Sequence, residues 1–405
     1  MRRDSWNRLY ALMGASVLWL AATAGWSQRL IWLGALPDGS SSTALAVSAD
    51  GRAVVGWGYD ASGQWRAFRW TQETGMQHLG TLGGDGSMAY GVSADGAVVV
   101  GWASNASQEW RAFRWTQAGG MQDLGDLGAG ETRAYGVSAD GAVVVGTSSN
   151  RAFRWTQAGG MQDLGTLGGS WSSAHGVSPD GSVVVGWAYT STGQSRAFRW
   201  VGAAEMQDLG ALSDADNSYA QGVSADGNVV VGWATNASNQ SLAFRWTQET
   251  GMQNLGALGG CCSEASSVSA DGAVVVGWAR NANQEVRAFR WRADTSAMED
   301  LNHAYASLLR SGSYLEYANA ISPDGRYIVG QGYNSARGRY EAYLLDTDSS
   351  RPAGDVDGDG CVNDSDLLAV LFAFGSGDGV EDLNNDGAVD DADLLTVLFN
   401  FGGGC

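Results

Sequence analysis

Oxygen-bearing side chains recur at fixed positions in two twelve-residue segments near the carboxyl end of the sequence. The first segment runs from Asp355 to Asp366, and the second begins 27 residues later and runs from Asp382 to Asp393. Positions 1, 3, 5, 9 and 12 are Asp or Asn in both segments, and position 6 is glycine. Ca²⁺ takes about six to eight oxygen ligands, and the glycine permits the turn that folds them inward. Counting the backbone carbonyl at position 7, the pattern predicts two calcium ions held by Asp355, Asp357, Asp359, Cys361, Asn363 and Asp366, and by Asp382, Asn384, Asp386, Ala388, Asp390 and Asp393.

Each loop leads into the same apolar stretch, residues 367–375 and 394–402. The matched stretches predict two short helices that pack on each other. We expect the buried face to consist of Leu367, Val370, Leu371, Leu394, Val397 and Leu398. Position 12 is Asp rather than the Glu of most EF-hands, so its carboxylate reaches less far, and no full helix precedes either loop.

These paired loops and helices resemble a type I dockerin over roughly residues 355–402. The resemblance implies a module that folds with Ca²⁺ and docks onto a cohesin-like partner outside the cell. The chain departs from the cellulosomal pattern because no basic residue follows Arg351, whereas those helices usually carry Lys or Arg near their ends. The resemblance therefore supports calcium-driven folding more strongly than a cellulosomal cohesin as the partner.

The charge composition excludes several classes of function. The formal net charge is −19, and all 24 basic residues are arginine. Without lysine the chain has no phosphate-loop lysine, no Schiff-base lysine and no Ser–Lys pair. The acidic balance also argues against nucleic acid as a partner.

The first residues have the composition of a secretory signal peptide. The apolar run over 9–22 is preceded by Arg2, Arg3 and Arg8, and small residues follow it. We expect residues 1–27 to be removed and the mature protein to be secreted or held at the cell surface, without a membrane span. A membrane anchor is the alternative, although the apolar run is shorter than a spanning helix requires.

Four cysteines are compatible with an oxidising compartment. If the two predicted helices pack antiparallel, the ends of the module meet, and a disulfide between Cys361 and Cys405 becomes possible. Cys261 and Cys262 are adjacent in the sequence. They form either a vicinal disulfide or a free pair, and the sequence leaves both alternatives open.

Residues 29–346 are an internal repeat. The marker Val-Ser-Ala-Asp-Gly, or a close variant, recurs at intervals of 40 to 53 residues, with its serine at Ser48, Ser93, Ser138, Ser178, Ser224, Ser269 and Ser322. Periods near 45 residues are typical of propellers and solenoids. Each period contains four β-branched or alternating segments separated by turns, so we predict an all-β, seven-bladed propeller of four-stranded repeats. A linker over 347–354 would join it to the small helical calcium domain over 355–405.

The two ends of the repeat array complement each other. The seventh unit stops at its third strand, residues 340–345, and a segment of the missing fourth-strand type lies at residues 30–36. We expect this amino-terminal segment to complete the last blade and remove its open edge. An open β-solenoid is the alternative, and it would need no such closure.

The repeated Arg-Ala-Phe-Arg-Trp and Met-Gln-Asp-Leu-Gly-x-Leu-Gly-Gly segments resemble the HAF repeat family of secreted bacterial proteins. The resemblance covers all seven units, with Glu341-Ala-Tyr343 replacing Arg-Ala-Phe in the last. It implies secretion and little about activity, because this family has no settled biochemical function.

Sequence variation among the repeats points to one face of the predicted ring. The loops between second and third strands, and the crossings between blades, vary more than the other turns, as binding surfaces do. Aromatic rings there suit sugar rings or protein contacts, and the candidate ligand-binding residues are Tyr59, Trp65, Trp110, Trp171, Tyr189, Tyr219 and Tyr333. Five tryptophans that end second strands are assigned instead to blade-to-blade packing: Trp57, Trp102, Trp187, Trp233 and Trp278.

No catalytic set follows from residue spacing, so we expect a non-catalytic binding protein tethered by its calcium module. The alternative is a dockerin-borne glycoside hydrolase or lyase that acts on polysaccharide from the variable face. A glycosidase needs two carboxylates, and the variable face offers Asp85, Glu131, Asp214, Asp216 and Glu264. A third reading makes the propeller a ring that binds other proteins.

Overall fold

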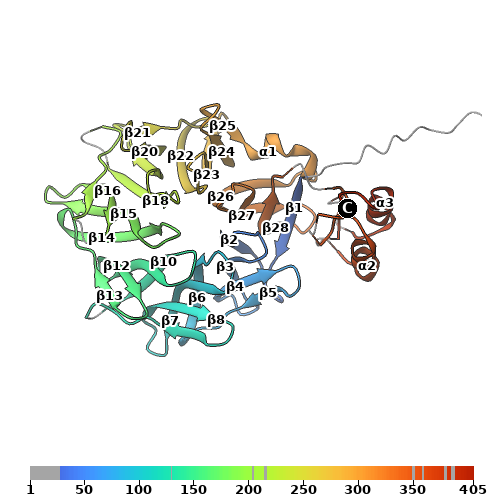
Figure 1. Ribbon diagram of the computed structural model, residues 1–405, viewed down its shortest axis with the longest axis horizontal. Coiled ribbons are helices and arrows are strands. Elements are labelled where there is room, and N and C mark those ends of the chain that lie inside the picture. Colours follow the sequence, from blue (N-terminus) through green and yellow to red (C-terminus); the bar gives the residue numbers. More distant parts are fainter. Residues whose placement is uncertain are drawn as a thin grey trace, which may run out of the picture.

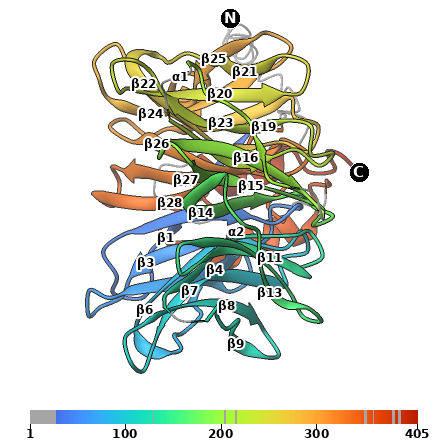
Figure 2. The same cartoon turned by 90° about the vertical axis from the view of Figure 1, so that its left-hand side faces the viewer.

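The computed structural model describes residues 28–128, 130–202, 205–213, 217–348, 352–357, 360–377, 381–384 and 388–405. Seven four-stranded antiparallel sheets are arranged around a central axis (Figure 1). The seven-bladed propeller predicted from the repeats is therefore confirmed. Figure 2 shows the ring from its rim, with the strands of successive blades fanned around the axis.

The strands fall into four classes by their position in the blade. The innermost strands are β2 Ser42–Val47, β6 Gly83–Val92, β10 Thr132–Val137, β14 Gly168–Val177, β18 Ser218–Val223, β22 Gly259–Val268 and β26 Tyr314–Ile321. The second strands are β3 Val54–Tyr59, β7 Val98–Asn105, β11 Val143–Ser148, β15 Val183–Thr190, β19 Val230–Thr235, β23 Val274–Asn281 and β27 Tyr327–Asn334. The third strands are β4 Trp65–Thr71, β8 Trp110–Thr116, β12 Arg151–Thr156, β16 Ser195–Val201, β20 Ser241–Thr247, β24 Val286–Arg292 and β28 Arg339–Asp346. The outer strands are β5 Gly75–His78, β9 Gly120–Asp123, β13 Gly160–Asp163, β17 Gln207–Asp208, β21 Gly251–Asn254, β25 Ala297–Asp300 and, in the seventh blade, β1 Arg29–Gly34.

The amino-terminal strand closes the ring. β1 pairs antiparallel with β28, with Leu30 opposite Leu345 and Trp32 opposite Tyr343. The seventh blade thus has the order β1-β28-β27-β26, which is the predicted closure, and the open solenoid is wrong. Leu30 and Trp32 pack in one core cluster and Ile31 in another, so alternate side chains of β1 face different neighbours.

The apolar second strands are buried on both faces because each blade lies between two others. In β7, Val98 and Val100 pack with residues of the third blade, including Phe153, whereas Val99 packs with Val55 of the first blade. This arrangement explains why the second strands are continuous Val-rich runs rather than alternating apolar and polar residues.

The repeated marker forms a turn that also links adjacent blades. In the second blade, the Ser93 hydroxyl donates to Asp95 Oδ1 at 2.6 Å and accepts from the Val98 amide at 2.9 Å. Gly96 has a φ of +70°, which glycine adopts without strain. Its carbonyl accepts a hydrogen bond from Arg69 of the preceding blade at 3.0 Å. The second arginine of Arg-Ala-Phe-Arg-Trp therefore mainly connects one blade to the marker turn of the following blade.

The helical tail packs beside the closing blade, as Figure 1 shows. The Val356 carbonyl accepts hydrogen bonds from Arg29 Nη1 at 3.2 Å and from Gln72 Nε2 at 3.1 Å. Buried valines of the tail belong to the same apolar cluster as residues of β1, β4 and β28. The tail is therefore in contact with the junction of the seventh and first blades.

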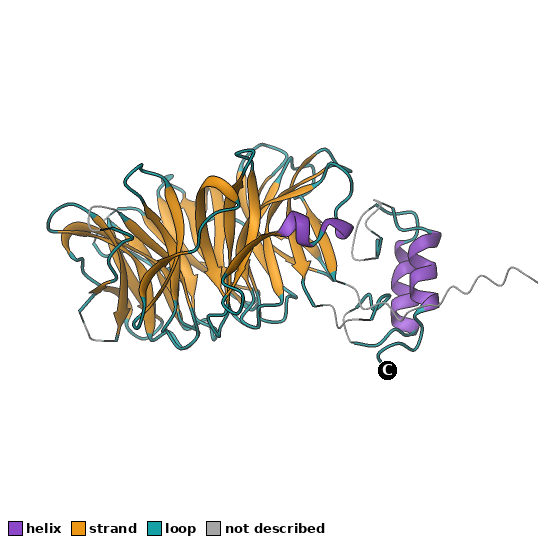
Figure 3. Ribbon diagram, turned by 90° about the horizontal axis from the view of Figure 1, so that it is seen from above, coloured by secondary structure: helices purple, strands orange, loops and turns teal. Residues whose placement is uncertain are grey.

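Two helices, α2 Asp364–Ala373 and α3 Asp391–Phe399, lie side by side in the tail (Figure 3). Val362 exchanges backbone hydrogen bonds with Gly402 and Gly403, which follow α3. Val389 does the same with Gly375 and Ser376, which follow α2. Each loop thus pairs with the segment after the other helix, so the helices are antiparallel.

The predicted helix interface is partly wrong. Val370 and Val397 are fully buried and Leu367 and Leu394 are half-buried, but Leu371 and Leu398 are each 47% exposed. Two short helices can bury only one face against each other, so residues at the edge of that face remain in contact with solvent.

Short helical segments also occur in the crossing from the sixth to the seventh blade, as α1 Leu301–Ala304 and η1 Ala306–Leu308. Within the described part of the chain, no helix is long and apolar enough to cross a bilayer. The predicted signal peptide, residues 1–27, lies outside the described residues.

Candidate functional sites

The first acidic loop gathers its carboxylates around one point. One oxygen from each of Asp355, Asp357 and Asp366 lies within 4.8 Å of the others. Asp355 and Asp366 are buried, and Asp355 Oδ2 accepts from the Gly360 amide at 3.1 Å, which wraps the loop around its first ligand position. A hard cation that prefers oxygen fits this donor set. Asp359, the predicted ligand at position 5, lies outside the described residues.

The second loop repeats the burial and the backbone hydrogen bonds of the first loop. Asp382 and Asp393 are buried, and Asp393 Oδ1 accepts from the Leu383 amide at 2.6 Å, as Asp366 Oδ1 does from the Val356 amide. Position 3 is Asn384 in this loop, so it contributes an amide oxygen instead of a carboxylate. Asp386 lies outside the described residues.

The position-9 and position-12 side chains also start the helices. The side chains of Asn363 and Asp390 accept from Ser365 and Ala392, and each helix has a complete capping box. Asp366 and Asp393 form the second half of these boxes and remain fully buried. Because no basic residue follows Arg351, this segment supplies no cation of its own to offset buried carboxylates.

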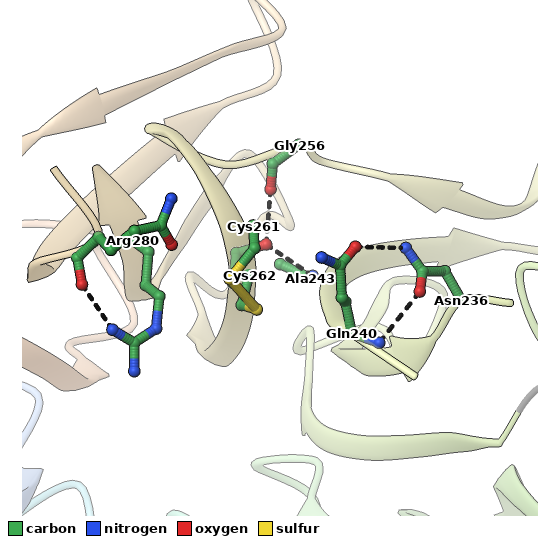
Figure 4. Close-up of a disulfide and its surroundings, with 9 residues drawn as sticks. Asn236, Gln240, Ala243, Gly256, Cys261, Cys262 and Arg280 are labelled. Atoms are coloured by element: carbon green, nitrogen blue, oxygen red, sulfur yellow. Dashed lines mark hydrogen bonds between the residues drawn. A yellow bond between two sulfur atoms is a disulfide. The ribbon is translucent and has the colours of Figure 1, made fainter. Parts of the chain in front are cut away.

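Both cysteine pairs are disulfide-bonded in the structure. Cys361, in the first loop, is joined to the carboxyl-terminal Cys405, and this bond connects the two ends of the tail. Cys261 and Cys262 form a vicinal disulfide on β22 (Figure 4). The alternative of a free pair, left open by the sequence, is not what the structure shows.

The seven candidate aromatic residues do not form one platform. Trp65 stacks on Trp110 with ring centroids 6.5 Å apart. Trp171 contacts Tyr189, and Trp187 connects both to Tyr219. Tyr59 packs on Trp57, and Tyr333 packs on Tyr314 and Tyr340. Most of these rings therefore pack on neighbouring rings. Trp65 and Trp171 are exposed, at 38% and 39%, and the other five are half-buried.

Sequence reasoning missed a cavity in the central channel. One residue from each innermost strand, three positions before the marker serine, faces the channel: Leu45, Tyr90, Tyr135, His175, Gln221, Ser266 and Asn319. Together with Trp233, Glu264, Ala265, Trp278 and Tyr317 these residues line a cavity of about 490 Å³. Trp233 and Trp278 were assigned to blade packing, but both are only half-buried and line this cavity. The missed signal is that the innermost strands differ at this position and at the position two residues before it, although the alanine between the two positions is constant.

His175 lies in the channel wall with an uncharged ring at neutral pH. Its ring stacks on Tyr135 at 4.7 Å, and its Nε2 lies 3.0 Å from the Ser173 hydroxyl. Desolvation by burial lowers the pKa of His175 from 6.5 to about 4.

Replacing His175 with tyrosine, the residue at this position in the second and third blades, should reduce the acid sensitivity of the propeller. The folded state binds fewer protons than the unfolded state between pH 6.5 and 4, so wild-type stability falls as the pH falls through this window. The loss attributable to this side chain is at most about 3 kcal/mol. Urea unfolding of wild type and His175→Tyr at pH 7 and pH 4 measures it, and an equal loss in both proteins would contradict the prediction.

The carboxylates considered for catalysis do not form a pair in the channel. Glu264 is the single carboxylate among the residues that line the cavity. Glu131 forms an ion pair with Arg133 at 2.7 Å. Asp214 and Asp216 lie outside the described residues. Glycoside hydrolysis uses two carboxylates that flank the scissile bond, and the described residues that line this cavity supply one of them.

Comparison with known proteins supports the fold alone. No protein-family model matches the chain, and no curated protein matches it by sequence. The propeller domain of the trilobed protease from Pyrococcus furiosus, described as having an open velcro topology, is similar with a TM-score of 0.53 and 10% identity, over 76% of this chain and 95% of that domain. A puromycin hydrolase gives a TM-score of 0.50 and 14% identity over 76% of this chain and 52% of the hydrolase. A putative TolB from Agrobacterium tumefaciens gives 0.41 and 18% over 59% and 91% of the two chains. By its fold, the chain is a seven-bladed β-propeller, closed by its own amino-terminal strand and followed by a short helical tail.

Proposed function

We propose that this is a secreted, non-catalytic binding protein whose propeller is tethered to a protein partner by a calcium-folded, dockerin-like tail. Two Ca²⁺ ions would be held by the loops 355–366 and 382–393. The support for calcium is the gathering of Asp355, Asp357 and Asp366 around one point, together with the same spacing in the second loop.

The observation that carries the docking proposal is a duplicated apolar surface on the tail. Eight of the twelve large apolar side chains exposed among the described residues belong to this tail. They form four pairs, each offset by 27 residues: Leu368 and Leu395, Leu371 and Leu398, Phe372 and Phe399, and Phe374 and Phe401. Phe372 is 87% exposed, and Phe399 is 64% exposed. Apolar groups concentrated in this way are typical of protein interaction sites.

The partner of this surface should be an apolar protein face of the cohesin type. The helices carry no basic residue to pair with acidic groups of a partner, and the interface depends mainly on burial of aromatic and leucine side chains. Because the two halves of the surface are nearly identical, the tail presents the same contacts in two orientations related by a half-turn.

Binding to a panel of recombinant cohesin modules tests the proposal. At millimolar Ca²⁺ we expect at least one module to bind the mature chain, and we expect chelation to abolish that binding. The double variant Phe372→Asp and Phe399→Asp should weaken binding at least about 100-fold, since buried aromatic anchors contribute most at such interfaces. The matched control is Val201→Asp, at an exposed apolar residue of the propeller. If no cohesin module binds in the presence of calcium, the tethering proposal is wrong.

A further inference from the structure

The central channel is hollow on one side because the seven channel-facing residues differ in size. On the side of the second to fourth blades, Tyr90, Tyr135 and His175 fill the space, with Tyr90 packed edge-on against Tyr135 at 5.3 Å and Tyr135 stacked on His175. On the side of the fifth to seventh blades, the equivalent residues are the smaller Gln221, Ser266 and Asn319. The cavity of about 490 Å³ results from this difference, and its size is that of a small-molecule site.

Aromatic rings line the wall behind the smaller residues. Trp278 contacts Tyr317 edge-on, with ring centroids 6.3 Å apart. One face of Trp233 is covered by Tyr219, which stacks on it at 4.1 Å. The three rings that line the cavity, Trp233, Trp278 and Tyr317, are only half-buried, so a part of each ring remains open to the cavity. The wall therefore offers aromatic surface to a ligand on more than one side.

The cavity carries one formal charge, and it is negative. Glu264 lies directly opposite Trp278 across the β22–β23 pair. Desolvation by burial raises the pKa of Glu264, while hydrogen bonds from Ser241 and Trp278 oppose this rise. None of the residues that line the cavity is arginine, and the His175 ring is uncharged at neutral pH. A cation that entered the cavity would meet a desolvated carboxylate and aromatic rings, without any competing positive charge in the lining.

We propose that this cavity binds the ammonium group of a small organic cation, held between the Glu264 carboxylate and the rings of Trp233, Trp278 and Tyr317. Aromatic rings attract cations through their quadrupole, and this attraction is stronger where water is partly excluded. The carboxylate opposes binding of anions, including acidic sugars. The inference concerns the propeller alone and does not depend on the calcium-folded tail.

Two sources of the ammonium group fit this chemistry, a quaternary amine and an amino sugar. Isothermal titration of the full mature chain with tetramethylammonium, choline and glucosamine separates these sources. The neutral isostere of choline, 3,3-dimethylbutan-1-ol, and glucose are the uncharged counterparts. We expect choline or glucosamine to bind at least about tenfold more tightly than its neutral counterpart.

Matched variants locate the site. Glu264→Gln removes the charge and retains the shape, and it should weaken ammonium binding about tenfold. Ser266→Tyr introduces the residue that the same position has in the second and third blades, and it should block the cavity and abolish binding. Glu109→Gln, at an exposed carboxylate in the loop between β7 and β8, should leave binding unchanged.

Thermal unfolding of each variant verifies that it folds. If Glu264→Gln does not fold, Ser266→Tyr still tests the site independently. The proposal is overturned if all three cations fail to bind at about 10 mM, a concentration that detects even weak sites. It is also overturned if the neutral counterparts bind as tightly as the cations, or if Ser266→Tyr binds as well as wild type.

Discussion

Removal of calcium is expected to unfold the helical tail while the propeller remains folded. Asp355, Asp366, Asp382 and Asp393 are each at most 3% exposed, and no basic residue follows Arg351 in the sequence. Carboxylates that are buried close together repel one another, and a bound divalent cation relieves this repulsion, so we expect folding of the tail to depend on the metal. If the free calcium concentration is 100 times the dissociation constant, each ion stabilises the tail by about 2.7 kcal/mol. Two ions together then supply about 5 kcal/mol, which is comparable with the whole stability of a small domain.

Differential scanning calorimetry of residues 28–405, with calcium and with chelator, measures this effect. We expect a separate transition of the tail that disappears with chelator and a propeller transition that changes little. Asp355→Asn and Asp382→Asn remove a ligand charge from the first position of each loop and should lower the tail transition. Asp364→Asn and Asp391→Asn, at the non-ligand tenth positions, are the matched controls. A tail transition that is equal with calcium and with chelator would show that the metal does not drive its folding.

Deleting residues 28–34 is expected to open the propeller. β1 buries Leu30, Ile31, Trp32 and Leu33, each at most 9% exposed. Each of these side chains contributes about 1.5–3 kcal/mol by burial, so their combined loss, about 6–12 kcal/mol, is as large as the stability of most domains. The deletion also leaves β28 as an unpaired edge, which promotes association between chains. We therefore expect a large drop in the unfolding temperature and the formation of oligomers.

Adding the missing strand as a separate peptide distinguishes loss of closure from general misfolding. A synthetic peptide of residues 28–36 should pair with β28 and restore the monomer, as seen by size-exclusion chromatography with light scattering. The same peptide with Leu30→Asp should not restore it, because Leu30 is 2% exposed and packs in an apolar cluster. If the truncated chain remains a monomer with wild-type stability, β1 does not hold the ring closed.

The propeller could be predicted from the sequence because the residues that specify each blade lie close together in the chain and recur in every repeat. The Ser-x-Asp-Gly marker forms its own turn, as Ser93 and Asp95 show, and it recurs in every blade. The Val-rich second strands identify segments buried on both sides. The closure by β1 was predictable for the same reason, since one strand type was missing at one end of the array and present at the other.

The predicted core residues were wrong where burial depends on partners that are distant in the sequence. Leu371 and Leu398 follow the apolar period of their helices, yet the facing helix is too narrow to cover them. Trp233 and Trp278 occupy the same repeat position as the buried Trp102, yet they face a cavity. The difference in burial arises from the side chains of the neighbouring blades, and the sequence of a single repeat does not contain those side chains.

Local spacing in the sequence determined the number of blades, the closing strand and the two oxygen-rich loops, because each depends on residues within one repeat or on a repeated pattern. Only the tertiary structure decided that Glu264, Trp233, Trp278 and Tyr317 share one cavity, since they come from three blades that meet at the axis of the closed ring. The shape of that cavity depends on differences in side-chain size among seven equivalent positions. Such differences in size leave a cavity only when the seven positions face one another across the channel.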